Sequence, residues 1–421
     1  MADPAHATPS PGTSLARAIA QTLPRNVLLL GAVSFLTDVS SEMTLTILPL
    51  FLANVLGVAP VFIGLIEGIA DATASLTRIF SGWLSDRLGR RKALAVAGYG
   101  LSAVSKPVLY FASAWGLVLA VRFSDRLGKG IRTAPRDALI ADSVAPQLRG
   151  LSFGFHRAAD TAGAFLGLGL VALIIFLSQR GSLQLERATF QTLVLVATAP
   201  GLLAVALLAW LVREPRPVAL KPQAAPPALA PRGLGRPFLG FLGVSTLFAL
   251  GNSSDAFLLL RAQHVGLSAL QVALLLMGFN FVYAVLATPA GALSDRLGRR
   301  GVILTGWGLY ALVYLGFALA GTGWQVWALF ALYGVYYALA EGTGRALVAD
   351  LVPADRRGTA FGAYHFALGV TALPSSLIAG ALWQVYGPPA PFYFGAALAL
   401  LAALLLAAWL PRMPRTRVTQ K

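Results

Sequence analysis

The sequence predicts an all-α polytopic membrane protein with twelve transmembrane helices, arranged as two related bundles of six. Three observations support this fold class. Of the 421 residues, 57% are hydrophobic and only 12% are charged, whereas about a quarter of the residues in soluble domains are charged. The apolar residues fall into runs of about 20 or more, which is the length that crosses a bilayer. The two halves of the chain also repeat each other.

Charges, glycines and prolines divide the apolar sequence into twelve predicted spans. An even number of spans places both ends of the chain on one side of the membrane. The loops on that side hold most of the arginines outside the spans, so the positive-inside rule predicts cytoplasmic termini in the cell (inner) membrane. The predicted spans are residues 26–54, 60–84, 93–113, 115–140, 151–178, 190–212, 237–260, 268–293, 301–321, 324–349, 358–385 and 390–410.

Two stretches of biased composition set the predicted domain boundaries. Residues 1–24 are rich in alanine, proline, serine and threonine, and the apolar run that follows is too long for the core of a signal peptide. Residues 213–236 are rich in proline, alanine and arginine, which predicts a flexible cytoplasmic linker. We therefore expect one bundle over residues 25–212, a second over 237–410, and a basic cytoplasmic tail over 411–421.

The repeat between the halves is detailed. The eight residues from Leu84 to Arg91 recur identically from Leu293 to Arg300, 209 positions later. Asp142, followed seven residues later by Arg149, recurs as Asp350 followed by Arg357, at a spacing of 208. Parallel repeats of this kind place a substrate site near the membrane midplane, between the halves.

These repeated segments resemble the loop signature of the major facilitator superfamily, Gly-x-Leu-x-Asp-Arg-x-Gly-Arg-Arg-Lys. The resemblance covers nearly the whole chain, from Arg25 to about Leu410, and implies the major facilitator fold and a transporter. It also implies that Asp86 belongs to a conformational latch, although the basic residues could simply anchor the loop in the cytosol. The matching residues are Gly82, Asp86, Arg87, Gly89, Arg90 and Arg91, with a second copy at Gly291, Asp295, Arg296, Gly298, Arg299 and Arg300.

Residues 122–130 resemble the fourth-span signature of proton antiporters in the same superfamily. Arg122, Gly128 and Gly130 match that signature, whereas Asp125, Arg126 and Lys129 are charged where the family usually has Gln, Gly and Ala. The fifth-span antiporter motif is echoed only by three glycines, Gly163, Gly167 and Gly169. The resemblance favours efflux, and proton-coupled import of a small anionic solute is the alternative.

Thirteen ionisable residues are candidates for the transport site because they lie inside predicted spans. A charge near the bilayer centre costs about 2.5–3.5 kcal/mol, so each needs a partner or a wet cavity. One interpretation pairs Asp38 or Asp71 with Arg122 and Arg126, and the other lets some acids carry protons. The candidates are Asp38, Glu42, Glu67, Asp71, Arg122, Asp125, Arg126, His156, Arg157, Asp160, Asp255, Glu341 and Arg345.

Glu42, Asp71 and Asp160 are the predicted proton carriers, and Arg122 or Arg126 is the cation expected to change partners. His156 is either a hydrogen-bonding residue or a proton relay. Aromatic residues such as Tyr333, Tyr336 and Tyr337 could stack a ligand, although helix packing explains most such residues.

Other chemistries lack support in the sequence. There is no cysteine, and the four histidines and four methionines form no close cluster, so we expect no metal site. Gly128-x-Gly130 is not a phosphate loop, so no cofactor and no ATP drive are expected. The membrane topology accounts for the basic clusters, so no nucleic-acid partner is expected. No nucleophile is paired with a base as in an active site, so the chain is not expected to be an enzyme.

The predicted function is therefore secondary active transport of a small solute by alternating access, as proton-coupled efflux. The expected partners are the small-molecule substrate, protons and the lipid bilayer, and the expected state is a monomer. Besides import, a membrane sensor or lipid-handling protein with the same fold is an alternative.

Overall fold

A computed structural model describes residues 23–88, 90–145, 148–179, 182–214, 234–353 and 356–409. Within these ranges all regular structure is helical, and consecutive helices group into the twelve predicted spans. The all-α polytopic prediction is confirmed. The predicted N-terminal segment, most of the predicted linker and the predicted tail lie outside the described residues, so the domain boundaries stay predictions.

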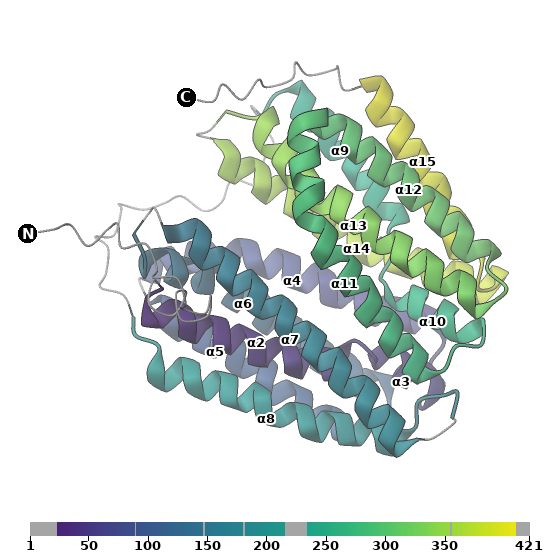
Figure 1. Ribbon diagram of the computed structural model, residues 1–421, viewed down its shortest axis with the longest axis horizontal. Helices are drawn as coiled ribbons and strands as arrows, with labels where there is room; N and C mark the ends of the chain where they lie inside the picture. Colours follow the sequence, from purple (N-terminus) through teal and green to yellow (C-terminus); the bar gives the residue numbers. More distant parts are fainter. Residues whose placement is uncertain are drawn as a thin grey trace, which may run out of the picture.

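The first six spans form one bundle, drawn in purple to teal in Figure 1. Two of the spans contain more than one helical segment, because Thr46 and Ile47 separate α2 from α3 and a short 3-10 helix ends the third span. In chain order the helices are α2 (Arg25–Leu45), α3 (Leu48–Asn54), α4 (Pro60–Leu88), α5 (Arg91–Ser105), η2 (Lys106–Phe111), α6 (Trp115–Asp142), α7 (Arg149–Ser178) and α8 (Arg187–Leu211).

The last six spans form the second bundle, drawn in green to yellow. The seventh span was predicted as one run over residues 237–260, but residues 252–255 interrupt it and it continues to His264. The sequence there, Asn-Ser-Ser-Asp, favours a turn over a helix. The helices are α9 (Arg236–Gly251), α10 (Ala256–His264), α11 (Ala269–Leu297), α12 (Arg299–Leu319), α13 (Gly323–Leu351), α14 (Arg357–Tyr386) and α15 (Ala390–Trp409).

The described helices have the composition of membrane spans. Nine of the spans are long and apolar enough to cross a bilayer by length and composition alone. Of the other three, α6 carries a charged stripe, the span of α9 and α10 is divided, and α13 is rich in tyrosine and tryptophan. Large apolar side chains such as Phe176, Leu195 and Leu404 are exposed on the outer helices. The chain is thus a multi-pass membrane protein.

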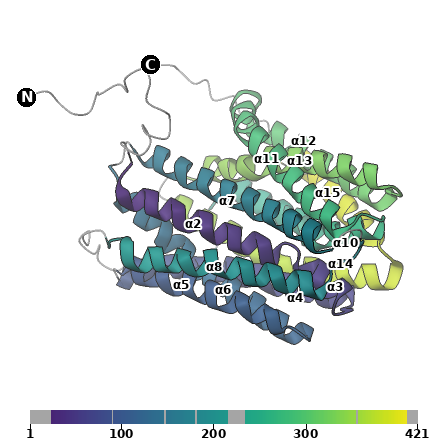
Figure 2. The ribbon, with the colours of Figure 1, turned by 60° about the horizontal axis from the view of Figure 1, so that its bottom comes forward.

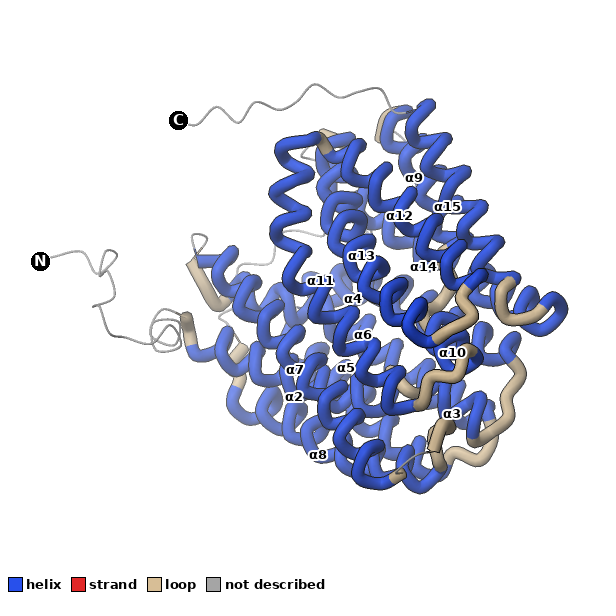
Figure 3. The backbone as a smooth tube through the Cα atoms, turned by 45° about the vertical axis from the view of Figure 1, so that its right-hand side comes forward, coloured by secondary structure: helices blue, strands red, loops and turns tan. Residues whose placement is uncertain are grey.

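The two bundles meet most closely at the side opposite the start of α2 and the end of α15. There α3 contacts α10, and Leu183 accepts a 3.0 Å backbone hydrogen bond from Ala269. Toward the start of α2 and the end of α15, called the terminal side below, the bundles spread apart, as Figures 1 and 3 show. Figure 2 shows α3, α10 and α14 together at the opposite end.

Close contact between α4 and α14 joins the bundles along part of their length. A Cβ atom added at Gly64 would lie 2.2 Å from the backbone oxygen of Ser376, and one at Gly380 would lie 2.6 Å from the Cα of Val61. Only glycine permits this approach of two backbones.

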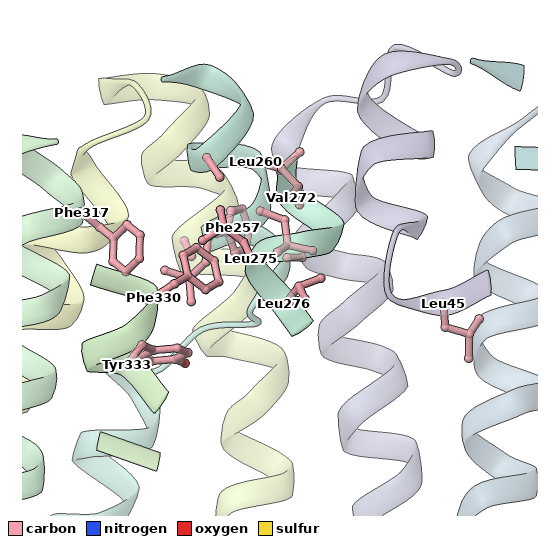
Figure 4. Packing of buried hydrophobic residues seen from close by; sticks show 14 of the residues in the cluster. Leu45, Phe257, Leu260, Val272, Leu275, Leu276, Phe317, Phe330 and Tyr333 are labelled. Atoms are coloured by element: carbon pink, nitrogen blue, oxygen red, sulfur yellow. The ribbon is translucent and has the colours of Figure 1, made fainter. Parts of the chain in front are cut away.

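The apolar core continues from one bundle into the other near α10. Phe257 and Leu260 of α10 pack among Val272, Leu275 and Leu276 of α11, and Phe317 and Phe330 belong to the same cluster (Figure 4). Buried side chains therefore fix the second half of span seven. The four-residue break comes just before this half and lies next to the space between the two bundles.

Candidate functional site

Most of the predicted site residues lie on four helices of the first bundle. Asp38 and Glu42 are on α2, Glu67 and Asp71 on α4, the stripe from Arg122 to Lys129 on α6, and His156, Arg157 and Asp160 on α7. The second bundle contributes Asp255 at the break before α10, and Glu341 and Arg345 on α13. The N-terminal bundle therefore supplies most of the charge, as the sequence predicts.

Glu67 and Arg122 form a buried ion pair. The Arg122 Nε donates to one Glu67 carboxylate oxygen at 3.1 Å and Nη2 donates to the other at 2.5 Å. Both side chains are almost fully buried. The pairing of Arg122 with Asp38 or Asp71 is wrong, because Glu67, one helical turn from Asp71, binds the Arg122 Nε and Nη2 instead.

Asp125 has three polar or charged neighbours. Ser102 of α5 donates to it at 2.5 Å, and Arg126 lies 3.8 Å away on its own helix. The buried Lys106 is electrostatically near and donates to Ser40 at 3.1 Å and Ser41 at 2.9 Å. Lys106 was not among the predicted site residues, although it lies inside the predicted span 93–113 and could have been included on the same ground as the others.

More arginines line the centre toward the terminal side than the predicted set includes. Arg132 is buried with its guanidinium 4.4 Å from the ring centroid of Tyr99. Arg136 donates to its neighbour Asp137 at 2.8 Å. Arg78 of α4 is electrostatically near Arg345 of the other bundle. The spacing on α6 could have suggested Arg132 and Arg136. The basic residues of that helix recur every three or four residues, at Arg122, Arg126, Lys129, Arg132 and Arg136.

The acids of α2 and α7 lie on helices that pack directly against each other. Asp38 is electrostatically near Asp160, Lys129 and Arg132, but among the described residues it forms no ion pair within 4 Å. Glu42 accepts a short hydrogen bond from Thr46. Asp160 lies 3.6 Å from His156.

The ring of His156 is held by a hydrogen bond on one side and lies near an acid on the other. Its Nε2 lies 2.7 Å from the hydroxyl of Ser34, which is 3.2 Å from the hydroxyl of Tyr99. This chain of buried groups joins α2, α5 and α7, and it is compatible with both interpretations of His156.

A polar chain links the two bundles at the centre. Arg157 of α7 donates to the hydroxyl of Tyr283 on α11 at 3.5 Å, and Tyr283 donates to Glu341 on α13 at 2.6 Å. Glu341 also pairs with Arg345 one turn later. Tyr283 was not predicted as a site residue, because a single tyrosine in an apolar helix carries no distinguishing pattern.

Asp255 is the acid at the break in span seven. It accepts hydrogen bonds from Tyr333 at 2.7 Å and from Tyr337 at 3.5 Å. The break also brings polar side chains from α4 and α14 together around a small cavity. Its volume is about 150 Å³, and its lining comprises Asp71, Asn252, Ser253, Ser254, Asp255, Tyr337, Ala372 and Ser376.

The two loop motifs occupy equivalent places in the two bundles. In the first, Arg91 forms an ion pair with Asp142, and Glu214 accepts hydrogen bonds from the backbone nitrogens of Arg91 at 3.0 Å and Lys92 at 2.9 Å. A carboxylate at the start of α5 also suits the helix dipole. Arg87 lies 5.4 Å from the Trp83 ring centroid, and Arg87 and Arg90 are exposed. The side chain of Asp86 and the whole of Gly89 lie outside the described residues.

In the second copy, Arg299 pairs with Asp295 at 2.7 Å and with Asp350 at 3.2 Å. Gly298 has a φ of +95°, which only glycine adopts easily, and it turns the chain between α11 and α12. Arg300 donates to the carbonyl of Ala407, Arg296 is exposed, and Gly291 has open space around it. Asp142 and Asp350, which marked the repeat in the sequence, are thus partners of the motif arginines.

The glycines of the fourth- and fifth-span motifs bring helix backbones together. A Cβ at Gly128 would lie 2.5 Å from the Gly98 oxygen, and one at Gly130 would lie 2.5 Å from the Thr77 Cβ. Gly163 meets the Phe35 oxygen in the same way at 2.4 Å. Their contacts fix α6 and α7 against α2, α4 and α5, which positions the charged stripe.

Among the described residues, no group of three or more histidine, aspartate or glutamate side chains could hold a metal ion. The geometry instead fits a small molecule or ion held between the two bundles. Twelve spans in two pseudo-symmetric bundles, with ionisable groups facing their junction, are typical of membrane transporters built from two related bundles.

Comparisons with known proteins give the family. The Major Facilitator Superfamily model matches residues 30–260 and again 239–421. The chain is 38% identical to an uncharacterised MFS-type transporter of Methanocaldococcus jannaschii over 393 residues, 91% of this chain and 94% of that protein. The chain therefore belongs to the major facilitator superfamily.

Solved structures share the fold at low sequence identity. The nucleoside transporter NupG superposes with a TM-score of 0.75 at 14% identity, covering 91% of this chain and 99% of that one. A bacterial homolog of the human lysosomal transporter Spinster gives a TM-score of 0.73 at 15% identity, covering 94% and 97%. These matches describe the architecture alone.

Proposed function

We propose that this protein is a secondary active transporter that exports a small solute across the cell membrane in exchange for protons. Both termini are cytoplasmic in this proposal, so the terminal side, where the bundles spread apart, faces the cytosol. The two bundles then rock about the central site to expose it alternately to either side. The protein acts as a monomer, because each bundle pair encloses its own site.

The observation that carries the proposal is the set of membrane-embedded carboxylates that form no close ion pair. Asp71, Asp38 and Asp255 form no ion pair within 4 Å among the described residues, although each lies inside a span. A carboxylate without an ion pair is costly at that depth even with cations farther away, which supports the binding of a proton or a cation during part of the cycle. Glu42, Asp71 and Asp160 are the proposed proton carriers. Since Arg122 is bound to Glu67, Arg126 is the proposed cation that changes partner.

Purified protein in liposomes loaded with the pH dye pyranine tests this function. Small amines and small carboxylic acids are added singly to one side, with protein-free liposomes as the control. Export coupled to protons predicts that at least one amine causes a protein-dependent proton flux of opposite direction. A response confined to the acids would indicate proton-coupled import of an anion. No response to either class would indicate a sensor or lipid-handling protein.

A further inference from the structure

The cavity at the break in span seven, called the span-seven cavity, joins the two bundles. Asp71 comes from α4 of the first bundle, and the other lining residues come from the break, α13 and α14 of the second. A ligand in this cavity therefore contacts both bundles at once, and only while they are close on the side opposite the terminal side.

The lining of the cavity carries only negative charge, although Arg126, Arg122 and Lys129 lie electrostatically near Asp71 outside the lining. Two of its lining residues are carboxylates and none is basic. The arginines nearest to Asp71 have other partners, since Arg122 is bound to Glu67 and Arg126 lies beside Asp125. Asp255 is bound only by tyrosine hydroxyls among the described residues. The cavity lining thus favours a cation over an anion.

The size of the cavity distinguishes an organic cation from a bare alkali ion. A cavity of about 150 Å³ in another protein holds a benzene molecule, which is a group of roughly six heavy atoms. A bare sodium ion would leave most of that volume to water. Tyr337 offers an aromatic ring on which an ammonium group can rest, and the Ser254, Ser376 and Asn252 oxygens can accept N–H bonds.

We propose that the span-seven cavity binds the ammonium head group of a small organic cation, with Asp71 and Asp255 as its counter-ions from opposite bundles. The proposal rests on the proposed transport function and names the substrate class. The ammonium enters between the carboxylates, while the remainder of the molecule extends into the central space. Release requires the bundles to separate at Asp71 and Asp255, which couples binding to the change of state.

Binding of n-butylammonium to the purified protein in detergent tests the proposal, with calorimetry or the fluorescence of the eight tryptophans as readout. The neutral 1-butanol, the anionic butyrate and sodium chloride serve as ligand controls. Asp71→Asn and Asp255→Asn each remove one charge and nearly preserve shape. Each should weaken butylammonium binding by about tenfold or more, as expected for a lost charge-assisted contact. Glu186→Gln, at an exposed acid before α8, is the matched control and should bind as the parent does.

The outcomes separate the proposal from its alternatives. Binding of butylammonium that both Asn variants retain in full, or equal binding of butanol, overturns it. Saturable binding of sodium that excludes butylammonium overturns it in favour of an alkali-ion site. Size-exclusion profiles and melting curves check that each variant is folded, and the Asp71→Asn, Asp255→Asn double variant must lose binding altogether. Binding in detergent needs no gradient, so a protein that binds butylammonium but moves no protons would contradict the transport mechanism while leaving the site intact.

Discussion

Glu67 and Asp71 lie one turn apart on α4, and their surroundings give them different roles. Glu67 accepts two hydrogen bonds from Arg122 and is almost fully buried. Asp71 is partly exposed to the span-seven cavity and has no ion pair among the described residues. The first is an internal ion pair that holds α4 to α6, and the second is free to bind a ligand or a proton.

The ion pair predicts a stability effect. Glu67→Gln leaves the buried Arg122 without a counter-charge, which should cost about 3–5 kcal/mol and reduce the amount of protein in the membrane. Thermal melting of detergent-purified protein measures the loss. Combining Glu67→Gln with Arg122→Met removes both charges and should recover much of the stability. A single variant as stable as the parent would contradict a structural role for Glu67.

The proposed proton carriers predict a different phenotype. Asp71→Asn, Glu42→Gln and Asp160→Asn remove a titrating group and nearly preserve shape. Each should abolish accumulation driven by a pH gradient. Exchange of substrate across the liposome membrane should continue in Glu42→Gln and Asp160→Asn, whereas Asp71→Asn should also slow exchange, because Asp71 lines the span-seven cavity. Protein amount must stay near the parent level. If all three variants accumulate substrate normally, these acids do not couple protons to transport.

At the residue scale, the sequence predicts that both acids lie inside the membrane but does not predict which of them pairs with Arg122. The i,i+4 spacing places Glu67 and Asp71 on one face of a helix, and apolar flanks place both inside the membrane. Which acid meets Arg122 depends on the relative depth and rotation of α4 and α6, which their glycine contacts set. Those contacts come from distant parts of the chain, so spacing within one helix does not predict the pair.

At the scale of helices, the sequence predicts where each span lies but not where a span is interrupted. Each span carries its own run of apolar residues, and so all twelve were found. The bend between α2 and α3 and the break between α9 and α10 each involve two to four residues within an apolar run. The polar Asn252–Asp255 segment is a turn signal, but only the cavity beside it gives the break a role.

The contact between α4 and α14 gives a prediction at this scale. Gly64→Leu would place side-chain atoms where the Ser376 carbonyl lies, so the helices must separate on the side opposite the terminal side. A cysteine at Ser254 should then react faster with an impermeant maleimide added from that side. Gly100→Leu, where a Cβ meets no atom within 4 Å, is the control and should leave the rate unchanged. An unchanged rate in Gly64→Leu would mean that this contact does not close the site.

On the scale of the whole molecule, the two bundles differ in charge although they share one fold. The first supplies the stripe on α6 and the acids of α2, α4 and α7, and the second supplies Asp255, Glu341 and Arg345. The second bundle instead concentrates tyrosines, with Tyr310, Tyr314, Tyr333, Tyr336 and Tyr337 in mutual contact. Repeats keep the residues that shape a bundle and its loops, whereas the residues that face the central site have diverged.

The direction in which the site opens depends on the orientation of the chain in the membrane, and the arginine distribution predicts that orientation. A single cysteine at Ala225, in the predicted linker, and another at Gly321, between α12 and α13, test it, because the chain has no cysteine of its own. Gly321 has open space for a Cβ, so the substitution is sterically tolerated. In intact cells an impermeant maleimide should label position 321 and not 225, and permeabilised cells should show both labelled. The reverse pattern would place the termini outside, and the spread side of the bundles would then face away from the cytosol. The predicted topology would then be wrong, and the central site in this conformation would open to the outside.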